Sequence, residues 1–177
     1  MRLMTKKVQN CLPAVIALSV LFMWVFPLAA SVPASDIQLN VAGAGPREVE
    51  DTVQLSIQRD YAEAWHSMEA ALDSGDASRL NQYWVGIAHD KLAEKVQDEV
   101  QTNVRVRYQD KSHQLQAIYY PTDGAALLLH DNAEVELQVL DSGKLVHSET
   151  LHQKYVVLMT PGQDRWFVRV LQAVPSF

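Results

Sequence analysis

The chain has 177 residues, of which 48% are hydrophobic and 20% are charged, and its net charge is −6. This composition supplies a core for one globular domain and excludes general disorder. Residues 1–35 hold three basic residues and no acidic one, so the rest has 12 basic and 21 acidic residues and a net charge of −9. Such an acidic body repels phosphate groups, so we expect no nucleic-acid partner.

The first element along the chain is an export segment. Arg2, Lys6 and Lys7 precede residues 11–30, which carry no charge, and a short Val-Pro-Ala sequence follows. A basic start, an apolar run and small residues at its exit are typical of a signal peptide. The run, of about 20 residues, also spans a bilayer if it is not cut. We therefore expect residues 1–35 to be a signal peptide or a membrane anchor.

Either reading places the remaining chain outside the cytoplasm, periplasmic or secreted, because the basic residues precede the apolar run. The membrane would be contacted only through residues 11–30, in the uncleaved form. The single cysteine, Cys11, lies in this segment, so the exported body has neither a disulfide nor thiol chemistry. Residues 36–46 mix polar residues with Gly, Ala and Pro and predict a linker, which leaves residues 47–177 as the domain.

Helices are predicted first in the domain. Apolar residues recur at steps of three or four, which places them on one helix face: Val49, Val53, Ile57, Tyr61, Ala64, Met68 and Leu72. Gly75 suits a left-handed cap at the end of this helix. Asp76 suits the N-cap of a short second helix. A third helix is predicted from about residue 87 to 102, with a charged face toward solvent.

From Asn103 onward the apolar period changes from 3.6 to 2, which indicates strands. The predicted strands are residues 104–109, 113–120, 125–140, 145–159 and 165–174. Asp-Lys-Ser at 110–112 predicts a tight turn. A bulge or break is predicted near 130–132. Helices followed by strands on short turns predict an α+β domain, with the helices packed on one face of a curved antiparallel sheet of about four to five strands.

This pattern resembles the NTF2-like superfamily, which includes SnoaL-like domains and is also described as a cystatin-like cone. The matching residues are Tyr61 and Trp65 on the first helix, Gly75-Asp76 at the break, Tyr83 after it, and Arg165-Trp166-Phe167-Val168 on the last strand. The resemblance covers residues 47–174 and implies a cone between helices and sheet. The order of elements is closer to extracytoplasmic members behind one membrane helix, such as VirB8-like components or the domain of ARC6-like proteins.

Familiar catalytic and metal-binding motifs are absent from the sequence. The six histidines show no i, i+4 pair of the kind that binds zinc on a helix, so we expect no metal site. There is no G-x-S-x-G elbow and no glycine loop between a strand and a helix. We therefore expect no cofactor.

The best catalytic candidates are Tyr61, Asp76 and His130, with the tyrosine as proton donor and the aspartate or histidine as base. Each has a structural alternative: a core position for Tyr61, a helix cap for Asp76 and a bulge for His130. A second set of candidates comprises the aromatics that would line a pocket in the cone or fill its core: Tyr61, Trp65, Tyr83, Trp84 and Trp166.

The leading interpretation is a non-enzymatic, exported NTF2-like domain that binds a protein partner or a second copy of itself through its open sheet face. The alternative is a small-molecule binding protein, or a lyase or isomerase, that holds a small apolar ligand in the cone. Polar groups with shifted pKa values that converge in the interior would favour chemistry, and a filled apolar interior would favour an interaction module.

Overall fold

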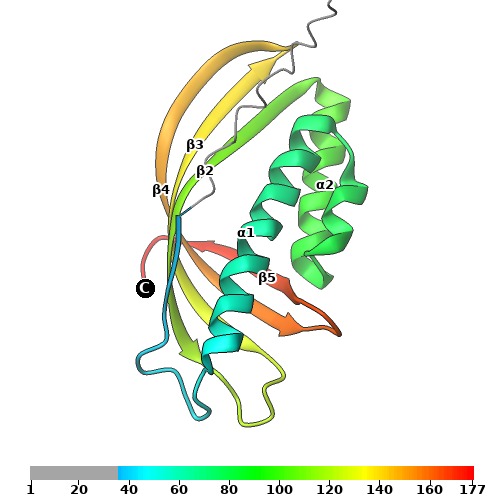
Figure 1. Cartoon of the computed structure of the whole chain (residues 1–177). Helices are drawn as coiled ribbons and strands as arrows, with labels where there is room; N and C mark the ends of the chain where they lie inside the picture. The colour runs from blue at the N-terminus through cyan, green and yellow to red at the C-terminus, as the bar shows by residue number, and fades with distance from the viewer. Residues whose placement is uncertain (1–35) are drawn as a thin grey trace, which may run out of the picture. The chain divides into compact units, whose positions relative to one another are not determined.

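The computed structural model describes residues 36–177, in which a long curved sheet lies against two helices (Figure 1). The predicted export segment, residues 1–35, lies outside the described residues. The elements, in chain order, are β1 (Asp36–Asn40), α1 (Asp51–Ser74), the 3-10 helix η1 (Ala77–Gln82), α2 (Gly86–Thr102), β2 (Val104–Tyr119), β3 (Leu127–Asp141), β4 (Lys144–Pro161) and β5 (Trp166–Val174). In this region no helix is long and apolar enough to cross a membrane.

The sheet has five strands in the order β1-β2-β3-β4-β5. Helices on one face of a curved sheet of this size confirm the predicted fold class. The sheet is mixed and not wholly antiparallel as predicted, because β1 pairs in parallel with β2 while the later strands pair antiparallel through short turns. Strand β1 lies within residues 36–46, where the sequence predicts a linker.

Two local predictions for the sheet are wrong. The Asp-Lys-Ser sequence at 110–112 does not form a turn, because β2 continues through it as one strand with a bulge between Asp110 and Ser112. Conversely, β3 keeps an unbroken register through residues 130–132 with both neighbours. The bulge therefore lies on β2 and not on β3, and it shapes the candidate site described below.

The three predicted helices are present, although Val49 lies before the N-cap of α1 and the short second one is the 3-10 helix η1. Helix α1 ends where Gly75 takes a left-handed φ of 71° and donates its N–H to the carbonyl of Ala71. A side chain at this position would meet Val100 at 2.8 Å, so glycine also permits the close approach of α2. Asp76 caps η1 by accepting the N–H of Ser78 at 3.0 Å.

The segment between η1 and α2 joins the outer edge of β5. Val168 donates its N–H to the carbonyl of Tyr83 at 2.8 Å, and Val85 donates to the carbonyl of Val168 at 3.0 Å. Trp84, between them, turns inward and donates its indole N–H to the carbonyl of Ala64 at 2.9 Å. The bend after α1 therefore covers this edge of the sheet and locks α1 to it.

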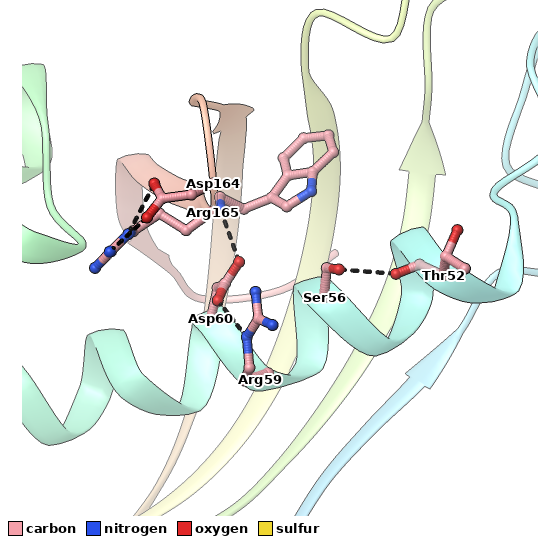
Figure 2. Close-up of polar contacts among 7 residues, drawn as sticks. Thr52, Ser56, Arg59, Asp60, Asp164 and Arg165 are labelled. Carbon is pink, nitrogen blue, oxygen red and sulfur yellow. Dashed lines mark hydrogen bonds and ion pairs between the residues drawn. The ribbon is translucent and has the colours of Figure 1, made fainter.

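Asp60 fastens the middle of α1 to the start of β5. Its buried carboxylate accepts the backbone N–H of Trp166 at 2.7 Å and the Nε–H of Arg59 at 2.8 Å (Figure 2). The Arg59 side chain is 60% exposed, whereas that of Asp60 is 2% exposed. This hydrogen bond is buried, and it satisfies the Trp166 N–H.

We expect Asp60→Ala to lower the free energy of unfolding by roughly 2–3 kcal/mol, because it leaves a buried N–H unpaired. Urea unfolding followed by tryptophan fluorescence measures this change. Arg59→Ala is the matched control and should cost less than about 1 kcal/mol, since an exposed ion pair contributes little. Equal losses for the two variants would contradict this account of Asp60.

Candidate functional site

Four polar side chains meet between helix α1 and the sheet. They are Tyr61 from α1, Asp110 and His113 from β2, and Asp131 from β3. The Tyr61 hydroxyl donates to Asp131 Oδ2 at 2.8 Å. His113 Nδ1 lies 2.7 Å from the same oxygen, and His113 Nε2 lies 2.7 Å from Asp110 Oδ1. The last contact is an ion pair whose orientation departs from that of an ideal hydrogen bond. The imidazole is thus held between two carboxylates.

The bulge in β2 is what brings Asp110 and His113 to one face. Residues three apart on a regular strand point to opposite faces. The bulge adds Lys111 as an unpaired residue, so Asp110 lies opposite Val135 and His113 opposite Ala133, both of which face the core. Glu69 on α1 supports this geometry by accepting the Asp110 N–H at 2.6 Å.

The two contacts of His113 determine its charge. A neutral imidazole has only one N–H, so its other nitrogen would set a lone pair against a carboxylate oxygen 2.7 Å away. Burial on its own lowers the pKa of His113, but hydrogen bonds and charge from Asp110 and Asp131 outweigh it and raise that pKa to about 9. His113 is therefore an imidazolium at neutral pH.

Aromatic rings close the site. The ring centroids of Trp65 and His113 lie 4.6 Å apart, and Tyr61 meets His113 edge-on at 5.3 Å. Tyr61, His113 and Asp131 are 0% exposed and Trp65 is 1% exposed. Burial, and then the Asp131 carboxylate, raise the pKa of Tyr61 well above its usual value, so its hydroxyl stays a donor.

A tyrosine, a histidine and two aspartates have the chemistry of an acid–base site. A general acid or base must come within hydrogen-bond distance of the reacting group. Tyr61, His113 and Asp131 are fully buried, so no substrate reaches them in this conformation. Asp131 Oδ1 and Asp110 Oδ2 are buried and have no hydrogen-bond partner among residues 36–177. The network therefore holds charge inside the core and leaves some of its carboxylate oxygens without a hydrogen bond.

The structure brings only one of the three catalytic candidates into this network. Tyr61 belongs to it. Asp76 lies at the surface as the cap of η1. His130 precedes Asp131 on β3 and therefore points to the opposite face, where its ring stacks on Phe177 with centroids 4.0 Å apart.

The five aromatic candidates for a pocket are packed in or against the core. Tyr61, Trp65, Trp84 and Trp166 are buried, and Tyr83 packs against the core with Arg165 over its ring at 5.2 Å. Two hollows instead lie on the outer face of the sheet, with volumes of about 190 and 350 Å³. Both are lined by Gln114 and Asn132.

Asp110, His113 and Asp131 were not among the predicted site residues. The sequence pattern could have placed two of them in the core. Asp131 is an even number of residues from Leu127, Leu129 and Val135 and so faces inward with them, and His113 likewise faces inward with Leu115. A charged residue on an apolar strand face requires a buried partner. Asp110 could not be placed in this way, because the bulge reverses the face of the sheet to which it points.

Within residues 36–177 there is no group of three or more side chains placed to hold a metal ion.

A known structure shares this architecture, and two others match with lower TM-scores. The intermembrane space region of the chloroplast protein ARC6 superposes with a TM-score of 0.62 at 11% identity, covering 74% of this chain and all of that one. A protein of unknown function with a cystatin-like fold from Nostoc punctiforme matches with a TM-score of 0.42 and 13% identity, covering 73% of this chain and 97% of that one. A putative calcium/calmodulin-dependent protein kinase II association domain from Xanthomonas campestris matches with a TM-score of 0.39 and 11% identity, covering 81% and 98%.

The chain shares with the ARC6 region the α+β fold of helices on one face of a curved sheet, which is the predicted fold class. At these identities the likeness concerns the fold alone. No family model matches the sequence. No curated protein matches it either.

The His113 network makes a pH-dependent prediction. Because its folded pKa of about 9 exceeds the ordinary value of 6.5, its stabilisation is complete below pH 6.5 and is lost as the pH rises through 9. We expect the free energy of unfolding to fall by about 3 kcal/mol over this range from this group. Urea unfolding at a series of pH values measures this slope.

His113→Gln should remove the slope and also cost roughly 3–5 kcal/mol at pH 6.5, because it leaves buried carboxylates without a cation. His130→Gln, on the outer face of β3, is the control and should keep the wild-type slope. An unchanged slope in His113→Gln would contradict the assignment of an imidazolium to this site.

Proposed function

We propose that residues 36–177 form a non-enzymatic protein-interaction or assembly module that works outside the cytoplasm, with residues 1–35 as its export signal or anchor. The burial of the interior supports this proposal most directly. Tyr61, His113 and Asp131, the groups best suited to acid–base chemistry, are 0% exposed. They contact one another and the core and are closed to solvent, so the side chains that a partner could reach lie on the surface of the domain.

Apolar residues on that surface support an interaction function. Several are more than half exposed, and they come from both helices and from β4: Leu55, Ile87, Val100, Leu145 and Val146. Contiguous exposed apolar side chains, unlike single ones, mark binding surfaces, and Leu145 and Val146 are adjacent on β4. The ARC6 region with the same fold is named as part of an intermembrane space, which is compatible with a module outside a cytoplasmic compartment.

A second candidate is a small-molecule binding protein, or a lyase or isomerase, with a small apolar ligand in the cone. The observation in its favour is that the Tyr61 hydroxyl and His113 Nδ1 both lie within 2.8 Å of one oxygen of Asp131. A donor and a buried cation at such a distance are suited to proton transfer. This function requires Trp65 to move, because its ring packs on His113.

Native mass spectrometry of the full chain, purified in mild detergent from its own host, separates the two candidates. An interaction module should give masses of the chain alone or of protein assemblies, with no retained small molecule. Tyr61→Phe should then change stability, by roughly 1–3 kcal/mol, without changing the mass spectrum.

A stoichiometric small-molecule adduct would contradict the interaction module. The matched control is Tyr119→Phe, since Tyr119 is exposed on β2. An adduct that Tyr61→Phe abolishes and Tyr119→Phe retains would establish the cone as a binding site.

A further inference from the structure

Strand β4 is longer than its outer neighbour. Strand β5 pairs only with residues 154–161 of β4. The other part of β4, residues 144–153, pairs with β3 on one side and with no strand among residues 36–177 on the other. Figure 1 shows β4 continuing past the end of β5 toward the β3–β4 turn. Every residue from 144 to 150 is exposed.

This free edge has only part of the usual protection of an edge strand. Unpaired backbone N–H and C=O groups are a template for another strand, and proteins block them with proline, charge or bulges. Residues 144–153 contain no proline, and Leu145 and Val146 are 52% and 57% exposed. A bulge at Val146 limits regular pairing to the stretch beyond it. The edge is therefore open to a short strand-to-strand contact.

We propose that a second copy of this chain pairs antiparallel with this edge, about a two-fold axis at Ser148, so that two sheets become one. This inference rests on the proposed interaction function and names the partner. In such a pair, side chains directly opposite share a face of the sheet. Ser148 would then face its own counterpart, and His147 would face the partner's Glu149 on either side of the axis.

The pairing of His147 with Glu149 favours this register over the one centred on Glu149. His147 and Glu149 already lie on one face, with Nε2 and Oε1 3.3 Å apart within the chain. Centring on Ser148 sets each histidine opposite a carboxylate of the other copy. A shift by one residue sets Glu149 opposite the partner's Glu149, and like charges directly opposite are destabilising.

Disulfide trapping tests the register. In a full chain carrying Cys11→Ser, Ser148→Cys would set two thiols opposite each other, with Cα atoms roughly 4.5–5.5 Å apart, within disulfide range. We expect mild oxidation to convert most of this variant to a covalent dimer at micromolar concentration.

Thr150→Cys is the matched control. It is equally exposed but lies two residues from the axis, so it should not cross-link to itself. Absence of a Ser148→Cys dimer, or equal cross-linking by Thr150→Cys alone, would overturn the inference.

A charge exchange gives an independent test by sedimentation equilibrium of the full chain. His147→Glu should weaken dimerisation roughly tenfold, because two carboxylates then face each other at both ends of the pair. The exchange His147→Glu with Glu149→His keeps opposite groups facing and should restore the wild-type dissociation constant. Failure of the double variant to recover would count against this register.

The result also separates this inference from the proposed function. A chain that stays monomeric and binds a strand of a different protein at β4 would overturn self-pairing and leave the interaction module intact. A retained small-molecule ligand would overturn the interaction module, whatever the cross-linking shows.

Discussion

The burial of His113 between Asp110 and Asp131 is the constraint on which the rest of the domain depends. An isolated buried charge is prohibitively costly, so the ion pairs must be kept intact by everything around them. The Tyr61 hydroxyl ties them to α1, Glu69 holds the bulge that aims Asp110 inward, and Trp65 covers the imidazole. Helix, bulge and adjacent strands are therefore held in one arrangement, because any slip would separate buried charges.

Helix α1 uses neighbouring residues to make two such links. Tyr61 reaches the network on β2 and β3, and Asp60 reaches the backbone of β5. The helix therefore spans the sheet and is hydrogen-bonded toward both of its halves. The interior consequently holds a tyrosine, a histidine and two aspartates that solvent does not reach in this conformation.

The sheet is protected unevenly. Residues 83–85 cover the edge of β5, whereas β4 extends beyond β5 with its edge uncovered. The covered half carries the buried core, and the uncovered half carries exposed apolar and titratable side chains. This asymmetry places the exposed apolar and titratable side chains at the rim of the sheet, which is why we propose binding and not a reaction.

The sequence by itself determined the parts that depend on local periodicity and capping. The stripe of α1, the left-handed Gly75, the Asp76 cap and the change to a two-residue period were all readable, because each rests on interactions between residues close in the chain. The tertiary structure decided the rest. Asp110-Lys111-Ser112 has the local preferences of a turn, but bonds to Glu69 and His113, far along the chain or across the bulge, make it part of a strand. The same bulge reverses the parity of Asp110, and strand alternation gives the inward position to Asp131 and the outward one to His130. The site was therefore only half visible in the sequence, since register and bulges are set by distant partners that local patterns do not contain.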